Sequence, residues 1–199
     1  MKSICIYSAE ITAGALKVME SRVVADLLLK SVDDVTWKSA LLKENILQTR
    51  SPQTANRFAQ LIRNRLETMT PDLWRLVRDG NKLVATHACL AATVKRSAIV
   101  ADFLYLVVRD LLRQYEVKLT NRDWTDFIYD CRNRIPDLPE WHENTMIRMR
   151  SSVFQILAQA GYIDNTHSRQ LRYVYIADEV LQYLYENNEK TVLRCIQLK

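Results

Sequence analysis

QTRSPQTANRFAQLIRNRL, residues 48–66, predicts an amphipathic helix whose outer face is rich in arginine and amide side chains. Ser51 is a favoured N-cap residue, and Pro52 suits the first helical position, where a missing N–H costs nothing. Apolar residues recur at helical spacing and predict the buried stripe: Ala55, Phe58, Ile62 and Leu66. Long hydrogen-bonding side chains occupy the opposite face: Gln53, Asn56, Arg57, Gln60, Arg63 and Asn64.

The same stretch contains four arginines and no carboxylate, namely Arg50, Arg57, Arg63 and Arg65. Gln, Asn and Arg side chains pair with base edges, whereas Ser, Thr and backbone N–H groups at a helix start suit phosphate oxygens. The DNA-contacting residues predicted here are Arg50, Ser51, Gln53, Thr54, Asn56, Arg57 and Arg63. The alternative is an ordinary solvated basic face, and the absence of any acid favours the nucleic-acid interpretation.

A second amphipathic helix is predicted just upstream. VDDVTWKSALLKENIL, residues 32–47, has helical spacing and is expected to end near Asn45. Two helices joined by a short turn, the second of them basic and rich in amides, describe a helix-turn-helix.

Composition bounds the fold class. The chain has 199 residues, of which 48% are hydrophobic, so it can bury one core or two small ones. Its net charge of +5 fits localised basic patches better than a uniformly basic surface. With only three glycines and four prolines, the composition predicts a mainly α protein.

Cysteine spacing and hydropathy indicate a soluble, cytoplasmic protein. Four widely separated cysteines predict reduced, mostly buried thiols rather than a disulfide framework or a zinc site: Cys5, Cys89, Cys131 and Cys195. The N-terminus lacks the long apolar region of a secretory signal. AIVADFLYLVV, residues 98–108, contains Asp102 and is too short to span a bilayer, so it predicts a helix buried at the centre of the fold, and no membrane association is expected.

The remainder of the chain divides into a hub and a C-terminal lobe. Residues 81–115 are almost continuously helix-forming, which predicts a packing hub. Three units are therefore expected: an N-terminal helix-turn-helix lobe at 1–70, a central helical hub at 71–116, and a C-terminal winged-helix-like lobe at 117–199.

The C-terminal lobe is predicted from a change of period. Thr120 and Asp123 form a cap pattern for the helix 121–134, and Asn144 or Thr145 is expected to cap the next helix, which Gly161 ends. GYID and RQLRYVYI then predict a small β-hairpin, with polar turn residues between them. A final helix, ADEVLQYLYENN, and a short tail follow.

A second candidate surface lies on this lobe. The helix before the hairpin has a polar face of Arg148, Ser151, Ser152, Gln155 and Gln159, and the hairpin tip spans residues 165–168. The predicted DNA-contacting residues are Arg148, Ser152, Gln155, Arg169 and Arg172. The winged helix is expected to have a polar, mobile tip at residues 165–168. The alternative is an ordinary β-hairpin that closes the domain with a solvated polar tip, and Asp164 and the acids Asp123, Asp126 and Asp130 weaken the positive field.

Catalytic patterns are missing from the sequence. His87 lies in an apolar helix and predicts a hydrogen-bonded core histidine, and His142–Glu143 lacks the second histidine of a zinc protease. Asp33 and Asp34 are expected to cap a helix rather than bind a metal. With no phosphate-binding glycine loop and no nucleophile–base pattern, we expect no enzyme activity, no cofactor and no metal.

Three segments resemble the BrxA family of BREX bacteriophage-defence systems: YSAEITAGAL, ENILQTRSPQTANRFAQLIRNRL and THACLAATVKRSAIVADFLYLVVRDLL. The resemblance extends to about Gly161 and includes the pattern Tyr7, Ser8, Thr12 and Gly14 and the run that starts at Gln48. It implies an all-helical fold with helix-turn-helix-like parts, binding to double-stranded DNA, and a place beside a methyltransferase and ATPases in one operon.

Together, residues and resemblance predict a non-enzymatic double-stranded DNA-binding component of a BREX phage-defence system, with other BREX proteins as further partners. Binding is expected to be largely independent of sequence, because base-reading groups are few and phosphate contacts dominate affinity. Two alternatives remain open: a protein-interaction subunit that docks its basic faces on an acidic partner, and an RNA-binding helical protein.

Overall fold

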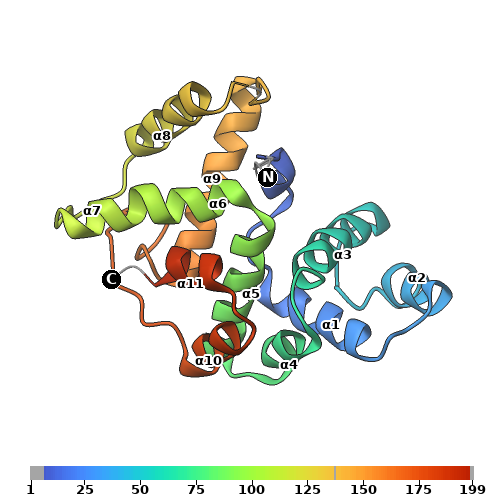
Figure 1. Cartoon of the computed structure of the whole chain (residues 1–199). Coiled ribbons are helices and arrows are strands. Elements are labelled where there is room, and N and C mark those ends of the chain that lie inside the picture. Colours follow the sequence, from blue (N-terminus) through green and yellow to red (C-terminus); the bar gives the residue numbers. More distant parts are fainter. Residues whose placement is uncertain (1–6, 137, 198–199) are drawn as a thin grey trace.

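Helix α5 (Lys82–Arg96) runs through the middle of the protein, and every residue from Val84 to Val94 is buried. The computed structural model describes residues 7–136 and 138–197. The other elements surround α5 (Figure 1): η1 (Ala9–Ala13), α1 (Val18–Leu29), α2 (Asp34–Leu42), α3 (Pro52–Leu66), α4 (Pro71–Asp79), α6 (Ala98–Asp102), η2 (Phe103–Val108), α7 (Arg109–Arg113), α8 (Asn121–Arg134), α9 (Glu143–Ala160), α10 (Asp178–Glu186) and α11 (Lys190–Ile196). The mainly α class predicted from composition is confirmed.

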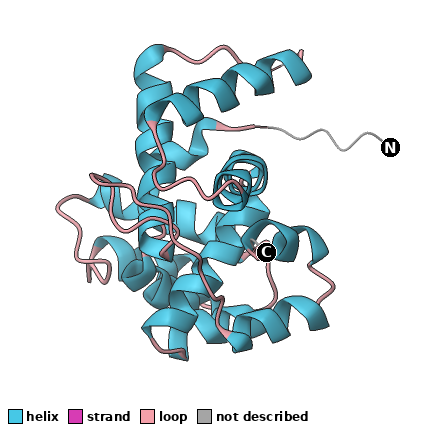
Figure 2. Cartoon of the chain, turned by 90° about the vertical axis from the view of Figure 1, so that its left-hand side faces the viewer, coloured by secondary structure: helices cyan, strands magenta, loops and turns pink. Residues whose placement is uncertain are grey.

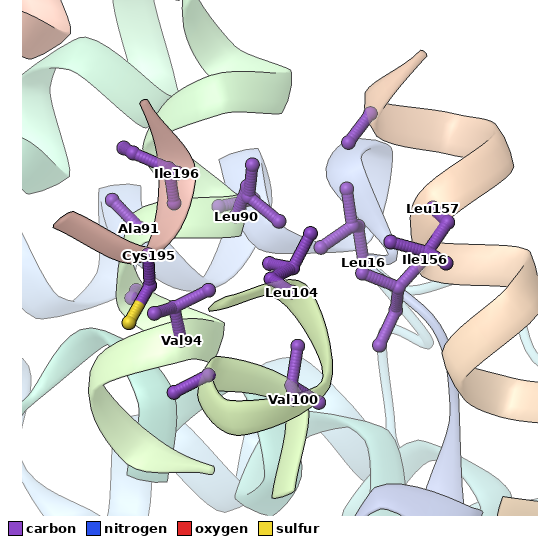
Figure 3. Packing of buried hydrophobic residues seen from close by; sticks show 14 of the residues in the cluster. Leu16, Leu90, Ala91, Val94, Val100, Leu104, Ile156, Leu157, Cys195 and Ile196 are labelled. Atoms are coloured by element: carbon purple, nitrogen blue, oxygen red, sulfur yellow. The ribbon is translucent and has the colours of Figure 1, made fainter. Parts of the chain in front are cut away.

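One hydrophobic core joins segments that are far apart in the sequence. Figure 3 shows Leu90 and Val94 of α5 packed near Leu104 of η2 and the C-terminal residues Cys195 and Ile196. Leu16, Ile156 and Leu157 continue the same core towards α9. The described residues thus share one continuous core, and the division into an N-terminal lobe, a central hub and a C-terminal lobe with boundaries at 70/71 and 116/117 stays a prediction.

The apolar stretch 98–108 lies inside one longer helical run, formed by α6, η2 and α7. The segment η2 is a π-helix, and Phe103, Leu104 and Val108 are buried. Asp102 is accommodated because the Tyr7 hydroxyl donates a hydrogen bond to its carboxylate. Burial, and then this contact with Asp102, raise the pKa of Tyr7 above its usual value.

The N-terminal side is built around α1, which packs against α3, α4 and α5. The upstream helix of the predicted helix-turn-helix ends earlier than expected: α2 stops at Leu42, not near Asn45. Asn45 and Gln48 have positive φ angles of 47° and 50°, which a continuing helix does not permit. The linker between α2 and α3 consequently covers residues 43–51, longer than the three or four residues of a compact helix-turn-helix.

The helix starts in the C-terminal part differ in their caps. The predicted cap of α8 is confirmed as a complete capping box between Thr120 and Asp123. The cap predicted for α9 was wrong: this helix begins at Glu143, with His142 in the N-cap position and no side-chain cap. Gly161 ends α9 as predicted, in the left-handed conformation at φ 91°.

The predicted β-hairpin forms only one isolated antiparallel bridge, Ile163–Leu171, and a second bridge, Lys118–Gln170, joins it to the segment before α8. Figure 2 accordingly shows helices and loops but no strand over the described residues. The last backbone hydrogen bond of the pairing runs from the Arg172 N–H to the Tyr162 carbonyl, and the next residue, Tyr173, donates its hydroxyl to the Leu112 carbonyl oxygen at 2.9 Å. The prediction of an eight-residue strand at RQLRYVYI was thus wrong.

The C-terminal residues close the core. The expected tail after α10 instead forms α11, whose Val192, Leu193, Cys195 and Ile196 are buried. His87 is confirmed as a core histidine: it is 1% exposed, and its Nδ1 accepts a hydrogen bond from the Ala177 N–H at 3.0 Å.

Candidate nucleic-acid interface

The start of α3 is held by hydrogen bonds within the preceding loop. Ser51 is the N-cap, and its Oγ accepts from the Thr54 N–H at 3.2 Å. The two hydroxyl groups of Ser51 and Thr54 lie 2.9 Å apart. Asn45 bonds both the N–H and the carbonyl of Thr49, each at 3.0 Å. This loop presents Arg50 in an exposed position immediately before the helix.

The exposed face of α3 has amides at its centre and arginines on both flanks. Gln53, Asn56, Arg57 and Gln60 are exposed, whereas Ala55, Ala59, Ile62 and Leu66 on the other side are buried. Phe58 is half-buried rather than part of the core, and the Arg57 guanidinium lies 5.4 Å from the centre of its ring. No acidic side chain pairs with Arg50 or Arg57 among the residues described.

Two other arginines of the basic run are already engaged. Arg63 forms an ion pair with Glu67 at 2.6 Å and stacks 4.9 Å from the Trp37 ring. Arg65 is 4% exposed and donates to the backbone carbonyls of Ala15 at 2.6 Å and Gly14 at 3.0 Å. Burial lowers the pKa of Arg65 to about 10, so it remains charged at neutral pH.

The C-terminal half of α3 is connected to the centre of the fold through Glu10. Asn64 donates to the Glu10 carboxylate at 3.0 Å, and Arg96 at the end of α5 pairs with it at 2.9 Å. Gln60 in turn donates to Asn64 at 2.6 Å. The side chains of Arg57, Gln53 and Asn56 remain outside this network, so they form the free part of the α3 face.

Helix α9 presents the second predicted face. Arg148 and Gln155 are exposed and Ser152 is half-buried, and the described residues provide no ion pair for Arg148. Gln159, at the end of this face, instead accepts from the Leu16 N–H at 2.9 Å. The free part of the α9 face therefore runs from Arg148 to Gln155.

The acids of α8 lie on the side away from α9. Asp123, Asp126 and Asp130 line a hollow of about 530 Å³ between α8 and the η2–α7 helix. The side of α8 towards α9 carries Arg132 and Tyr129. These acids therefore weaken the positive field on the opposite side of α8, not on the side that faces α9.

The hairpin tip is tied down by its own side chains. Asn165 accepts from the N–H groups of His167 at 2.8 Å and Ser168 at 2.9 Å. Asp164 accepts from Ser168, Asn165 and Gln170, which together lower the pKa of its carboxyl, the Ser168 hydrogen bond most of all. Such a network is typical of an Asx turn, and the mobility expected of the tip stays a prediction.

The two tip arginines differ. Arg169 points inward: it donates to Asn121 at 2.6 Å and lies 5.5 Å from the centre of the Phe154 ring. Arg172 is exposed. Of this pair, only Arg172 is placed to meet a ligand from solvent.

A sequence profile of the BrxA family matches residues 5–188. The chain belongs to the BrxA family. Its relatives include "BREX protein BrxA" of Paramagnetospirillum magneticum, 46% identical over 96% of both chains. Another is "BREX protein BrxA" of Escherichia coli O9:H4, 33% identical over 97% of this chain and 91% of the relative.

A solved structure supports the same fold. The crystal structure of an uncharacterized protein from Magnetospirillum magneticum superposes with a TM-score of 0.89 at 44% identity, covering 97% of this chain and 99% of the other. The resemblance noted up to about Gly161 thus extends through the C-terminal helices of this BrxA family member.

Within residues 7–136 and 138–197, no group of three or more His, Cys, Asp or Glu side chains is arranged to hold a metal ion, and no helix is long and apolar enough to cross a membrane. Cys89, Cys131 and Cys195 are free and buried as predicted, and Cys5 lies outside the described residues.

Sequence reasoning missed the residues that position α3. Glu10 and Arg96 are separated from α3 by dozens of residues, so no local pattern connects them. In this BrxA family member the basic run therefore contains one buried arginine, Arg65, one paired arginine, Arg63, and two exposed arginines, Arg50 and Arg57.

Proposed function

We propose that this chain is a double-stranded DNA-binding component of a BREX phage-defence system. The observation that carries the proposal is the α3 face, where Arg50 and Arg57 flank exposed amides and face solvent without an acidic partner among the described residues. A cation without an intramolecular partner can neutralise a phosphate and release counterions, which is the main source of DNA affinity. The relatives named BREX protein BrxA support the defence context.

In this proposal α3 acts as the recognition helix of a helix-turn-helix with a lengthened linker. A helix of this size fits the major groove, with Gln53 and Asn56 towards base edges and Arg57 towards a phosphate. Ser51 and Thr54 stand at the helix start, where hydroxyl and backbone N–H groups suit phosphate oxygens. With so few base-reading groups, binding is expected to depend little on sequence.

The C-terminal part supplies a weaker contact, in the order of elements of a winged helix. In chain order, residues 117–119 come before α8 and α9. Residues 169–172 form backbone hydrogen bonds of 2.9–3.0 Å with residues 117–119 on one side and with residues 162–164 on the other. Arg148, Ser152 and Gln155 on α9 and Arg172 beyond the tip form this second contact. Arg169 is assigned to holding Asn121 rather than to the ligand.

The protein acts without catalysis of its own in this proposal. It holds DNA in the cytoplasm for other members of the defence system, and those BREX proteins are its further partners. The side chains that carry the proposal are hydrogen-bonding and cationic groups, which suit phosphate binding, and the described residues contain no group of three or more His, Cys, Asp or Glu that could hold a metal ion.

A salt-dependent gel shift on duplex DNA tests the proposal. Arg50→Gln together with Arg57→Gln should weaken binding by up to about a hundredfold at 0.1 M salt and reduce the salt slope by about 1.8. The control is Arg75→Gln with Arg122→Gln, which removes two exposed arginines that already pair with Asp72 and Asp126. It changes net charge equally and should leave affinity nearly unchanged.

Two results would overturn the proposal. One is equal affinity and slope in wild type and in a folded Arg50/Arg57 variant. The other is tighter binding to RNA of equal length than to duplex DNA, which would support the RNA-binding alternative.

A further inference from the structure

A basic pocket is lined by residues of η2, α7, α10 and α11, and α11 packs against η2. Its volume is about 330 Å³, and none of its lining residues is acidic: Tyr105, Arg109, Arg113, Tyr185, Lys190, Leu193, Arg194 and Gln197. We call this set the basic pocket. It shares no residue with the α3 or α9 faces.

Helical spacing brings the charges of the basic pocket together. Tyr105, Arg109 and Arg113 are four residues apart along η2 and α7, so they share one side of that helix. Lys190 and Arg194 are four apart on α11, which packs against η2 and α6. Four cationic side chains thus converge from two helices.

Tyr105 organises two of these cations. The Arg109 guanidinium lies 3.7 Å from the centre of the Tyr105 ring, and the Arg194 guanidinium lies 4.5 Å from it. Cation–π contact fixes both groups in place, although like charges repel one another. The neighbouring cations lower the pKa of the Tyr105 hydroxyl, with the Arg109 hydrogen bond as the largest cause.

Nearby carboxylates compensate this charge only in part. Asp110 contacts Arg109 at 3.2 Å, and its side chain faces the hollow on the α8 side. Glu189 pairs with Lys95, and Glu186 accepts from Gln182 at 2.8 Å. Lys190 and Arg194 have no ion pair within the described part of the chain.

We propose that the basic pocket binds the phosphate group of a nucleotide-sized ligand. Guanidinium groups match phosphate oxygens with paired N–H donors, and a lysine adds a point charge. The volume lies at the lower end of the range for small-molecule sites. The Tyr185 side chain at the rim is 63% exposed and offers a face on which a base can stack.

The arrangement favours a small phosphate ligand over a duplex backbone. Duplex DNA spreads its charge along the helix axis, and contacts to it follow a line of successive phosphates. In the basic pocket the cations instead line one small volume, which suits a terminal phosphate or diphosphate of higher charge density.

Calorimetric titration of the full chain with pyrophosphate, and with ATP in the absence of metal, tests this site. Wild type should bind both probes at one saturable site for which they compete. Lys190→Gln with Arg194→Gln changes two exposed side chains, so folding should persist, and affinity should fall by at least about tenfold. Arg194→Lys keeps the charge but loses the paired donors, and should bind with intermediate affinity.

The control is again Arg75→Gln with Arg122→Gln, which should bind both probes like wild type. The Arg50/Arg57 variant should also keep pyrophosphate binding, so failure of the DNA proposal and failure of this one are distinguishable. The inference is overturned if neither probe binds saturably, or if the Lys190/Arg194 variant binds like wild type. It is likewise overturned if that variant loses duplex DNA while pyrophosphate does not compete, because the pocket would then be a backbone contact.

Discussion

Arg65 reaches from α3 to the Ala15 carbonyl oxygen at 2.6 Å and joins the basic run to the loop before α1. Four arginines that look alike in the sequence therefore have different tasks. Arg65 is buried and structural, Arg63 is paired with Glu67, and Arg50 and Arg57 face solvent. Arg65 must therefore be left out of any test of DNA affinity, because its loss would act through folding.

Arg65→Leu should destabilise the fold. Removing the guanidinium leaves the Ala15 and Gly14 carbonyls without partners, at a cost of about 2 kcal/mol in the free energy of unfolding. Urea unfolding measures this change. Arg57→Leu, an exposed change on the same helix, should stay within about 0.5 kcal/mol of wild type. Equal stability of the two variants would contradict the structural role of Arg65.

Arg148→Gln should weaken duplex DNA binding by up to about tenfold at 0.1 M salt and lower the salt slope by about 0.9. Arg148 is exposed on α9 without an ion pair in the described chain, so its loss removes at most one phosphate contact. Arg122→Gln is the matched control, because Arg122 is exposed but pairs with Asp126 on α8. If both substitutions have the same effect, α9 makes no specific contact and only net charge matters.

His87 should make stability depend on pH below neutrality. Burial lowers its pKa from the ordinary value, opposed in part by a hydrogen bond to the Ala160 backbone, and Nδ1 accepts from the Ala177 N–H. As pH falls below about 6.5, His87 is protonated in the unfolded chain but stays neutral in the folded chain until a lower pH. The contribution of neutral His87 to the free energy of unfolding is therefore present above that pH and is lost as the pH falls below it.

His87→Gln removes this titration. Urea unfolding between pH 7 and pH 5 should show a steeper loss for wild type, by about 1.4 kcal/mol for each pH unit over which only the unfolded state is protonated. His142 and His167 are exposed and remain in both proteins, so they serve as an internal control. Parallel pH profiles would show that His87 titrates alike in the folded and unfolded chain.

Local patterns predicted the helices and most of their ends well. The caps at Ser51 and at Thr120–Asp123 involve partners three residues away, so the sequence contains everything that determines them. The hairpin was overpredicted because Tyr173 and Tyr175 have high strand propensity. In the structure the Tyr173 hydroxyl instead donates to the Leu112 carbonyl 61 residues away, a tertiary contact that local strand propensity does not predict.

The residue types of the candidate site and its exposed helix face could be predicted from the sequence, but the intramolecular partners of its arginines could not. Exposure of Gln53, Asn56 and Arg57 follows from helical periodicity, and the structure agrees. The burial of Arg65 and the inward turn of Arg169 depend on Gly14 and Asn121, which lie about fifty residues from them. No spacing rule predicts such partners, because chain folding alone brings them together.

The purified protein should neither cut nor methylate DNA. Nucleases need carboxylates gathered around a metal, and methyltransferases need a cofactor cradle. The acids of α8 that come closest to such a group, Asp123 and Asp126, line an open hollow, and Asp123 already accepts from the Thr120 N–H at the helix cap. Incubation of the chain with plasmid, Mg²⁺, ATP and S-adenosylmethionine should leave the plasmid supercoiled and unmethylated. The matched sample is Asp123→Asn with Asp126→Asn, which should behave identically. Nicking or methyl transfer that copurifies with the wild-type chain and is lost in this variant would show that the hollow is catalytic, and the non-enzyme proposal would have to be abandoned.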